Sequence, residues 1–519
     1  MIKSLVKKGE YFDSVSLMIV GKNVTGMENV LDAAIVMATR ENKSILKTAG
    51  LYLEEFEKYN DTDLLIVIKT DQEIQFEKIF ENVNNLLKEI RKKDDQGFFS
   101  PKSLDGAIKI QPDSNLVLIS ITGKYAGNEA EKALKKGMNV MLFSDNVPLE
   151  TEIKLKKYAL KQNLLIMGPD CGTAIINGIP LAFSNIVNKG NIGIIAASGT
   201  GLQEVSSIIS EEGFGISQAI GTGGRDIKEE VGGMMFIASL EALKNDNQTE
   251  IIVLVSKPPN PAVLKKINEK IKEIPKPVIS VFLGADNNLI KESGAIAAET
   301  LEEAALLSCA ISNKSGISKV REFLKERRYN YQPIVDKTVK KISSKRKYIR
   351  GLFSGGTLCD EAQIILKKDI KNIFTNRSKT KEFTLEDSWI SKEHSLVDLG
   401  EDEFTLGRLH PMMDFDLRNK RIIQETKDRE TAIILFDLVL GNGANADPTG
   451  ELLPVIKKAK KIAPGISFIC SVTGTEQDPQ NKVNIIDILE KADVLVMPSN
   501  AAAAEIVSLI VKERRKNGI

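Results

Sequence analysis

Short apolar segments, each followed by a turn of small or polar residues and then an amphipathic stretch, repeat from residue 115 onward. The first three are Leu116 to Ile121, Val140 to Phe143 and Leu164 to Met167. The same order continues at Asn191 to Ala196 and at Ile251 to Val255. Such alternation is typical of parallel strands whose connecting helices cover the faces of the sheet. The chain is therefore predicted to be an α/β protein.

The first 95 residues follow a different pattern. Short β-rich runs at Asp13 to Val20, Ala33 to Ala38 and Leu64 to Lys69 alternate with polar helical stretches, of which Asp71 to Arg91 is the longest. A polar stretch from Arg91 to Ser103 follows and is expected to be a linker. A small α+β domain is predicted for the N-terminal part of the chain.

Composition excludes several classes of function. The 71 Lys and Arg residues against 70 Asp and Glu leave a net charge of +1, so no strong field attracts nucleic acid or an anionic membrane. The sequence has no secretory signal and no run of about 18 apolar residues, which predicts a cytoplasmic protein without a membrane segment. The four cysteines form no CxxC pair, and there are only two histidines. Neither a disulfide framework nor a metal site is expected.

The pattern of the second α/β unit recurs after a basic segment, Lys340 to Arg350. We expect this segment to be a solvated connector; the alternative, a nucleic-acid patch, lacks a companion basic stripe. Strand Ile192 to Ala196 and its turn correspond to strand Ile349 to Phe353 and its turn. The second copy carries an insertion within Thr375 to Lys427 that contains both histidines. Two pseudo-equivalent units are predicted, with asymmetric function in the insertion.

Two matching turns are candidates for binding an anion. Ser198-Gly199-Thr200-Gly201 and Ser354-Gly355-Gly356-Thr357 each lie between an apolar strand and a helix. Small residues leave backbone N–H groups accessible, hydroxyls add donors, and the start of a helix carries partial positive charge. Phosphate or carboxylate binding is predicted, and two ordinary tight turns are the alternative. Neither turn is a Walker loop, because no Gly-Lys-Ser/Thr triplet follows.

Loops at the ends of three strands are predicted to form a nucleotide-sized crevice with a glycine-rich segment. The candidate residues are Gly123, Asn146, Pro169, Asp170, Gly223 and Gly224. Purely structural turns are the alternative. Nearby Cys171 is expected to fill apolar space rather than to act as a nucleophile.

The insertion contains a dense polar cluster, Gly407-Arg408-Leu409-His410. Arg408 is the candidate for holding an oxyanion or carboxylate, and His410 for exchanging a proton near neutral pH. In the alternative, His410 only caps a loop beside Pro411. His394, with Lys392 and Glu393 before it, is expected to be a solvated surface residue.

Several of these motifs resemble those of a known family. The motifs similar to the succinyl-CoA synthetase α-subunit are Gly168-Pro169-Asp170-Cys171-Gly172, Ala197-Ser198-Gly199-Thr200, Gly221-Thr222-Gly223-Gly224 and Ser256-Lys257-Pro258-Pro259. Ser354 to Asp360 resembles the start of the C-terminal domain in the β-subunit of that enzyme. Together with Asp13 to Met18 and Gly407 to Met412, these motifs make the whole chain resemble the FdrA family of acyl-CoA-synthetase-like proteins.

The resemblance implies an α/β fold with a Rossmann-like CoA-binding-type domain, two flavodoxin-like domains and the small N-terminal α+β domain. The implied ranges are 1–100 for the N-terminal domain, 101–185 for the CoA-binding-type domain, 186–340 for the first flavodoxin-like domain and 347–519 for the second. This chain departs from the synthetases in two respects. The stretch that carries their phosphorylated histidine reads Lys291 to Ile296 here, without a histidine, and no ATP-grasp region is recognisable.

The resemblance also implies a function, because FdrA-like proteins are associated with allantoin and purine catabolism. One of them is a subunit of oxamate carbamoyltransferase, with two partner subunits. The implied reaction converts oxalurate and phosphate to oxamate and carbamoyl phosphate. The two turns would hold phosphate, Arg408 and His410 would grip the oxamate carboxylate or move a proton, and CoA is a possible ligand. The alternatives are an acyl-CoA synthetase that needs a partner for ATP use and a non-catalytic ligand-binding scaffold.

Overall fold

The computed structural model describes residues 1–10, 12–70, 76–94, 101, 103–378, 380–405 and 408–518. The chain divides into two compact units, residues 1–114 with 402–410 and residues 115–401 with 411–519. In the part of the chain described, no helix is long and apolar enough to cross a membrane.

The N-terminal unit contains a three-stranded antiparallel sheet in the order β1-β3-β2. Its elements are β1 (Ile2–Lys7), α1 (Ser14–Thr25), β2 (Val30–Met37), α2 (Arg40–Thr48), η1 (Glu54–Lys58), β3 (Leu64–Thr70), α3 (Phe76–Asp94), α4 (Leu104–Ile110) and α15 (Asp402–Thr405). One apolar cluster joins α1 and α3 to the sheet, and a second joins α2 and η1 to it. The unit is the α+β domain that the sequence predicts.

The predicted β-rich run from Asp13 to Val20 is wrong, because these residues open helix α1. The Asp13 carboxylate accepts the backbone N–H of Ser16 at 2.9 Å and so caps the helix. Leu17, Val20 and Val24 recur at helical spacing and are buried. Residues 71–75 and most of the predicted linker lie outside the described residues.

The second unit begins with a parallel sheet in the order β4-β5-β6. Its elements are β4 (Leu116–Ile119), α5 (Gly123–Lys135), β5 (Asn139–Leu142), α6 (Leu149–Lys161) and β6 (Ile166–Met167). Three strands correspond to one half of a Rossmann fold, which joins two such halves. The next two strands, β7 (Thr173–Ile176) and β8 (Ile179–Ala182), fall in the predicted range 101–185 but pair within the following sheet.

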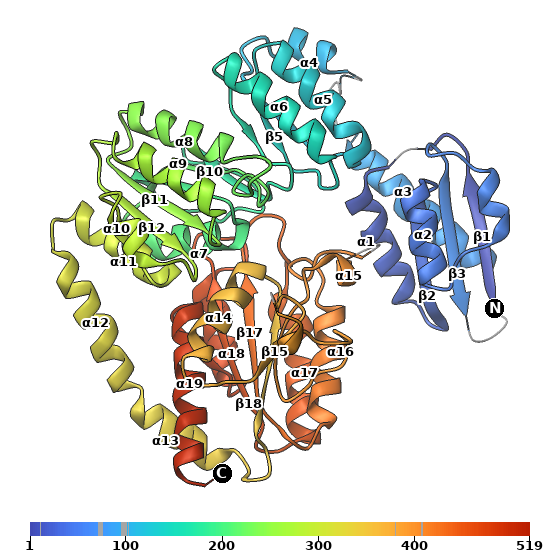
Figure 1. Ribbon diagram of the computed structural model, residues 1–519. Helices are drawn as coiled ribbons and strands as arrows, with labels where there is room; N and C mark the ends of the chain where they lie inside the picture. The colour runs from blue at the N-terminus through green and yellow to red at the C-terminus, as the bar shows by residue number, and fades with distance from the viewer. Residues whose placement is uncertain are drawn as a thin grey trace. The chain divides into compact units, whose positions relative to one another are not determined.

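That following sheet has the order β13-β12-β11-β9-β10-β7-β8 and is parallel from β13 to β10. Its further elements are β9 (Lys189–Ala196), α7 (Gly199–Glu211), β10 (Ile216–Gly221), α8 (Met234–Asn245), β11 (Ile251–Ser256), α9 (Pro261–Ile271), β12 (Val278–Phe282), α10 (Asn287–Lys291), β13 (Ile296–Ala297) and α11 (Leu301–Ser312). Helices α7 and α11 cover one face, and α8 and α9 cover the other (Figure 1).

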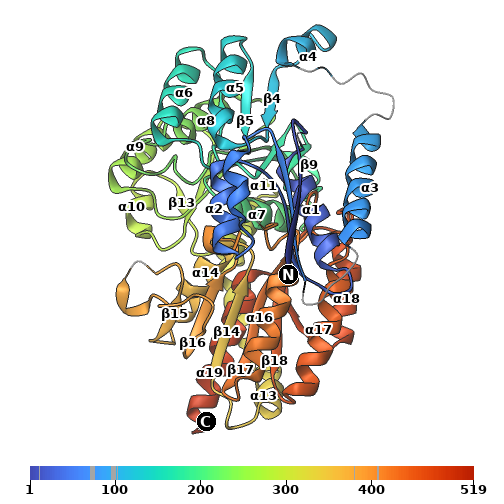
Figure 2. The ribbon, with the colours of Figure 1, turned by 90° about the vertical axis from the view of Figure 1, so that its right-hand side faces the viewer.

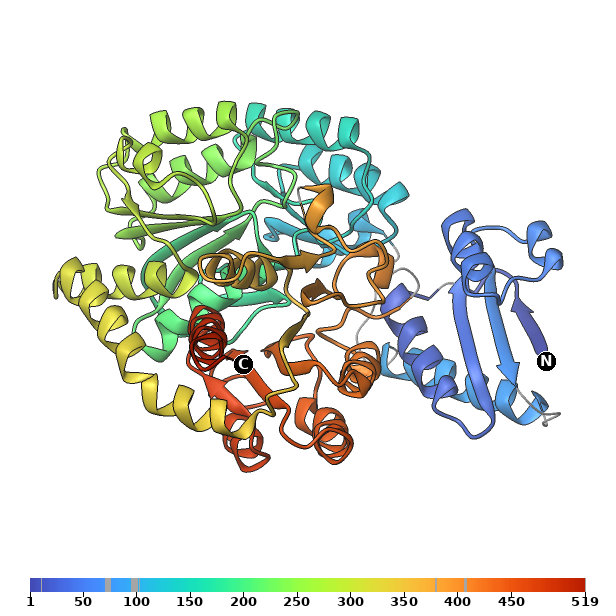
Figure 3. The same ribbon diagram turned by 60° about the horizontal axis from the view of Figure 1, so that its bottom comes forward.

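A second large sheet is parallel throughout, in the order β15-β16-β14-β17-β18-β19. Its elements, with the two helices that precede it, are α12 (Ile317–Asn330), α13 (Gln332–Lys341), β14 (Tyr348–Phe353), α14 (Gly356–Lys367), β15 (Ile373–Thr375), η2 (Lys381–Phe383), β16 (His394–Asp398), α16 (Asp416–Lys427), β17 (Thr431–Val439), α17 (Pro448–Ile462), β18 (Ser467–Thr473), α18 (Lys482–Lys491), β19 (Leu495–Met497) and α19 (Asn500–Lys516). Helices α14 and α19 pack on one face, and α16 and α17 lie on the other (Figures 2 and 3).

The two large sheets repeat one topology. The order β10-β9-β11-β12-β13 in the first corresponds to β16-β14-β17-β18-β19 in the second. Strand β15 ends at Thr375, where the predicted insertion begins, and adds an edge strand to the second copy. The sequence-predicted repeat of two α/β units is therefore confirmed.

Two residues that the sequence assigned to solvated segments are buried. Arg350 closes the predicted basic connector, yet it lies inside β14 and pairs with Glu425 and Asp428. His394 begins β16 and is only 8% exposed, so the predicted surface position is wrong. In each case a neighbouring strand covers a residue whose local sequence is polar.

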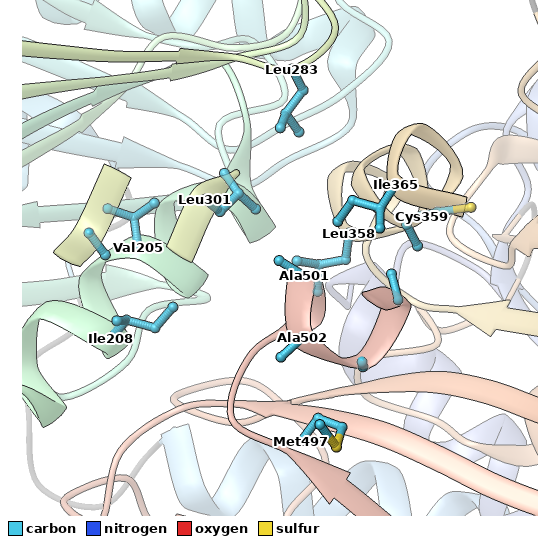
Figure 4. Close-up of a cluster of buried hydrophobic side chains, with 14 of the residues drawn as sticks. Val205, Ile208, Leu283, Leu301, Leu358, Cys359, Ile365, Met497, Ala501 and Ala502 are labelled. Atoms are coloured by element: carbon cyan, nitrogen blue, oxygen red, sulfur yellow. The ribbon is translucent and has the colours of Figure 1, made fainter. Parts of the chain in front are cut away.

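One apolar core joins the two large sheets. Val205 and Ile208 on α7, Leu301 on α11, Leu358 on α14 and Ala502 on α19 belong to the same buried cluster (Figure 4). Helix α7 packs on α11 and α14, and α14 packs on α19. The helical faces of the two flavodoxin-like domains therefore share a single seam, and burial of this apolar surface holds the domains together.

A buried ion cluster fastens the three-stranded sheet to the next domain. The Lys156 ammonium on α6 donates to Glu152 and Asp226 at 2.8 Å each, and to the Thr222 carbonyl at 3.3 Å. Asp226 also accepts the backbone N–H of Phe236 at the start of α8. All three charged groups of the cluster are buried, so each depends on its partners for the solvation it loses.

We expect Lys156→Ala to lower the free energy of unfolding of this part of the chain by about 3–5 kcal/mol, because buried Asp226 loses its counterion and Glu152 keeps only Arg225. Urea unfolding followed by circular dichroism measures the change. The neighbouring exposed residue provides the control: Lys157→Ala should stay within about 0.5 kcal/mol of the unsubstituted protein. Equal effects of the two substitutions would contradict this account.

Candidate functional site

The two predicted anion-binding turns lie against each other. We call residues 198–201 the first elbow and residues 354–357 the second elbow. Ser198 Oγ and Thr357 Oγ1 are 2.6 Å apart and share a hydrogen bond across 159 positions of sequence. A Cβ on Gly355 would lie 3.0 Å from the Thr200 side chain, and one on Gly201 would lie 3.2 Å from Thr357 Cγ2. Glycine at these two positions therefore permits the close approach.

Each elbow begins a helix at the carboxyl edge of its sheet. In the first elbow, Ser198 is extended, and its Oγ accepts the backbone N–H of Gly201 at 3.0 Å as the N-cap of α7. In the second, Gly355 precedes α14. The first N–H groups of a helix have no helical acceptor, and the helix dipole makes this end positive. Two such ends meet here, which favours an anion.

The second elbow already holds an internal carboxylate, which revises part of the predicted phosphate site. Asp437, at the end of β17, accepts the backbone N–H groups of Ser354 and Gly355 at 2.8 Å each. Ser354 Oγ lies 3.1 Å from both carboxylate oxygens, and Arg418 donates to the same group at 2.9 Å. Arg418 and Asp437 are fully buried. The donors of Ser354 and Gly355 therefore serve a buried ion pair, whereas Gly356 and Thr357 are the first two residues of α14.

Two cations lie beside the elbows. Lys257, which follows β11, pairs with Asp360 on α14 at 2.8 Å. Arg377, which follows β15, pairs with Asp360 at 3.1 Å and with Asp398 at 2.9 Å, and it also contacts Glu401. Lys257 keeps 38% of its side chain exposed, so its ammonium remains accessible to a ligand from solvent.

Asp398 is a buried acid of this group with a raised pKa. It is the last residue of β16 and is 2% exposed. A Cβ added to Gly356 would lie 2.5 Å from its Oδ2. Burial raises the pKa of Asp398 to about 6, against the opposing effect of Arg377. A carboxyl group with this pKa at the start of a helix is suited to exchanging a proton near neutral pH.

The sequence interpretation did not select Lys257, Arg377, Asp360 or Asp398. Their position relative to the strands was one available signal. Arg377 follows β15 and Asp398 ends β16, and parallel sheets bind ligands at the carboxyl ends of their strands. Strands β15 and β16 lie in the region read as an insertion, where their short apolar runs were not assigned. Lys257 belongs to a motif that was noticed only for its family resemblance.

The predicted crevice residues come together, but by direct packing of loop on loop. A Cβ on Gly123 would lie 2.0 Å from the Asp145 carbonyl and 2.7 Å from the backbone of Asn146. A Cβ on Gly223 would lie 2.3 Å from the Pro169 carbonyl. Backbone carbonyls therefore fill the space beside these glycines. Only glycine fits at these two positions, and the role of Gly123 and Gly223 in a ligand crevice stays a prediction.

The remaining residues of the crevice lie around these contacts. Asp170 donates its N–H to the Ser144 carbonyl at 3.1 Å, and Gly224 has the Ala197 carbonyl 3.9 Å from its Cβ position. Cys171 is buried, and burial raises the pKa of its thiol to about 12, which agrees with a space-filling role rather than a nucleophile.

Arg408 and His410 fall in the N-terminal unit, within residues 402–410, whereas the elbows lie in the other unit. Arg408 is exposed, His410 is half-buried, and Gly407 lies outside the described residues. Their participation in a site with the elbows stays a prediction. His394 lies at the start of β16, at the opposite end of that strand from Asp398.

Comparison with known proteins places the chain in a class. Family models match residues 352–510 (CoA-ligase), 187–284 (CoA binding domain) and 1–102 (AllF, heavy metal-associated domain). The succinate–CoA ligase α-subunit of Methanothermobacter thermautotrophicus is 27% identical over 176 residues, 33% of this chain and 58% of that protein. A solved structure of an acetyl-coenzyme A synthetase from Ca. Korarchaeum cryptofilum aligns with 14% identity over 78% of this chain and 84% of that one, at a TM-score of 0.33.

The family-model matches, together with the paired parallel sheets, define a succinyl-CoA synthetase-like protein with CoA-ligase and CoA-binding-type domains. The uncharacterized protein YahF of Escherichia coli K12 is 41% identical over 505 residues, which are 96% of each chain. The chain belongs to the same family, the FdrA family of succinyl-CoA synthetase-like proteins.

The description of the N-terminal match implies a heavy metal, but the residues present do not fit one. The cysteines lie at positions 171, 309, 359 and 470 and the histidines at 394 and 410, so residues 1–102 contain neither soft ligand type. Nowhere in the described ranges do three or more His, Cys, Asp or Glu side chains gather as a metal site.

We expect Gly356→Ala to abolish phosphate binding at the elbows while the chain still folds, because its Cβ would collide with Asp398 Oδ2 and lie 3.1 Å from Arg377 Nη1. Isothermal titration of the full chain with inorganic phosphate measures this. Gly26→Ala is the matched control, since its Cβ would meet nearby atoms only at 3.5 Å or more. Unchanged phosphate affinity in Gly356→Ala would remove the second elbow from the site.

Proposed function

We propose that the chain is the phosphate-handling subunit of an oxamate carbamoyltransferase, which converts oxalurate and phosphate to oxamate and carbamoyl phosphate. The observation that carries the proposal is the meeting of the two helix starts at the Ser198 and Thr357 hydroxyls, 2.6 Å apart. Lys257 and Arg377 lie at the same edge, where they pair with Asp360 and Asp398. Preorganised donors of this kind stabilise charge that develops on phosphate oxygens.

The proposed step is a direct transfer. A phosphate oxygen attacks the terminal carbonyl carbon of oxalurate, a C–O bond forms, and the bond from that carbon to the oxamate nitrogen breaks. The proton of hydrogen phosphate ends on the oxamate nitrogen, so atoms and charge balance. No phosphorylated histidine is needed, in agreement with a buried His394 at the far end of β16 and a Lys291 to Ile296 stretch without histidine.

Asp398 is the proposed carrier of that proton. Its pKa of about 6 lets it accept the proton from bound hydrogen phosphate and return it to the departing nitrogen. Arg377, 2.9 Å away, holds the carboxylate and limits the rise of its pKa. Arg408 and His410 stay candidates for gripping the oxamate carboxylate, and two partner subunits are proposed to complete the enzyme.

An acyl-CoA ligase is the second candidate, favoured by the CoA-ligase and CoA binding domain matches. It requires CoA and a nucleotide-using partner. A third candidate is a scaffold that binds a ligand without turnover. Thioester formation with CoA and ATP would select the ligase, and phosphate binding without any product in the full complex would select the scaffold.

Carbamoyl phosphate and oxamate should form when the complex with its partner subunits receives oxalurate and phosphate, as measured by mass spectrometry. Ser198→Asp should raise the KM for phosphate by about tenfold or more, because it adds a negative charge at the start of α7. Ser198→Asn is the control, since asparagine also caps a helix but carries no charge. Equal KM values in the two variants would contradict an anion site at the first elbow.

The pH dependence of kcat/KM should report the pKa of Asp398. The proton acceptor is the deprotonated form, so activity should rise with pH through about 6. Asp398→Asn should remove this limb and lower the rate by about 10² or more. Arg377→Gln should move the limb to higher pH, because Arg377 lowers the pKa of Asp398.

The charge-matched control for Arg377→Gln is Arg429→Gln, which removes an exposed guanidinium far from the elbows in sequence. It should leave the pH dependence of kcat/KM unchanged. An acid limb that persists unchanged in Asp398→Asn would show that another group transfers the proton.

A further inference from the structure

A cavity of about 210 Å³ lies at the amino ends of the strands of the second large sheet. Ala432, Ile433 and Val511 form its apolar part, and Tyr348 and His394 line it from β14 and β16. Lys347, Arg514 and Arg515 supply three cationic side chains to the same cavity, whose lining contains no carboxylate. At about 30 Å³ per water molecule, the space holds roughly seven water-sized groups.

His394 faces this cavity with an unused donor. Its Nδ1 accepts the backbone N–H of Ile349 at 3.2 Å, which leaves the proton of the neutral ring on Nε2. Tyr348 packs edge-on against the ring at 5.4 Å between centroids. Among the residues that the structure describes, none accepts a hydrogen bond from Nε2, although the residue is only 8% exposed. This N–H is therefore left to water or to a ligand that enters the cavity.

The charges around His394 do not cancel within the cavity. Lys347 is neutralised by Glu430 at 3.2 Å, and Arg350, behind the ring, by Glu425 and Asp428. Arg514 and Arg515 instead donate to backbone carbonyls, those of Ile342, Ser343 and Arg346 and that of Asp369. In the described part of the chain neither guanidinium pairs with a carboxylate, so two positive charges face the cavity without an acid.

We propose that this cavity is a binding site for a small oxyanion, with phosphate or carboxylate oxygens that accept the Nε2–H of His394 and pair with Arg515 and Arg514. Five or six non-hydrogen atoms fit the volume, which is the size of phosphate or of a small carboxylate such as oxamate. The chemistry is that of a carboxylate or phosphate held by arginine.

The site is distinct from the elbows. His394 and Asp398 are the first and last residues of β16, so roughly 13 Å of strand separates the cavity from the elbow edge. Neither Arg514 nor Arg515 has a role in the proposed transfer. An anion bound here would contact both α19 and the start of β14, and α19 packs on α14, the helix that the second elbow begins.

The experiment uses the two histidines as reporters. The full chain is labelled with 13C at histidine Cε1, so a carbon–proton correlation spectrum shows two imidazoles, and His410→Ala assigns them. Inorganic phosphate and oxamate are titrated separately at constant ionic strength, with chloride as the reference. We expect a saturable shift of the His394 signal with a Kd of about 1 mM or tighter for at least one of them.

The pKa of His394 gives a second readout. Burial first, and then Arg515 and Arg350, lower it to about 4, so an anion beside the ring should raise it. Saturation by phosphate alone assigns a phosphate site, and saturation by oxamate alone assigns a carboxylate site. If neither shifts His394 in a saturable way, the proposal is wrong.

A matched pair of variants tests the location. Arg515→Gln removes one cavity cation and should weaken binding by about tenfold. Lys516→Gln removes an exposed charge from the same helix end that does not line the cavity, and it should change the Kd by less than about twofold. Equal weakening in both variants, or none in Arg515→Gln, would overturn the assignment. Because Asp398 lies outside the cavity, Asp398→Asn should leave this titration unchanged whether or not the transfer reaction is correct.

Discussion

The seam between helices α7 and α11 of one domain and α14 and α19 of the other governs the rest of the molecule. Its side chains belong to a single buried apolar cluster, so separating the domains would expose much of the core. Because α7 and α14 begin at the carboxyl edges of their sheets, this packing also brings their starts together, and Ser198 meets Thr357. The candidate anion site is thus a geometric consequence of hydrophobic packing between two copies of one topology.

Buried charge makes the two copies unequal. In the second copy the Asp437 carboxylate, which also accepts from Arg418, occupies the backbone donors of the turn. In the first copy the Ser198 hydroxyl accepts the N–H of Gly201 as the helix cap. Asp398 then adds a second carboxylate beside the start of α14, held by Arg377. An anion that binds here as proposed would meet the start of α7 and, at the start of α14, a titratable acid. This asymmetry suits proton transfer coupled to anion binding better than simple storage of phosphate.

Much of the fold was predictable from local pattern, since strands such as β9, β11 and β14 contain short apolar runs that are followed by turns. The errors have physical causes. The run from Asp13 to Val20 is short, and its Ser and Val residues are compatible with a strand or a helix. The N-cap at Asp13 is the feature that indicates a helix. His394 and Arg350 stand in polar sequence, but neighbouring strands and acids bury them. Hydropathy reports the neighbours of a residue in sequence, whereas burial depends on neighbours in space.

The sequence by itself determined the parallel α/β architecture, its repeat and the two turns with open helix starts, because strand length, turn residues and helix caps act over a few positions. Only the tertiary structure decided what those turns meet. Ser198 finds Thr357 across 159 positions, Ser354 finds Asp437 across 83, and Asp398 finds Arg377 across 21. These contacts fix which backbone donors are already used and which cation opposes the raised pKa of a buried carboxylate. They depend on how sheets and helices pack, which no short stretch of the chain encodes.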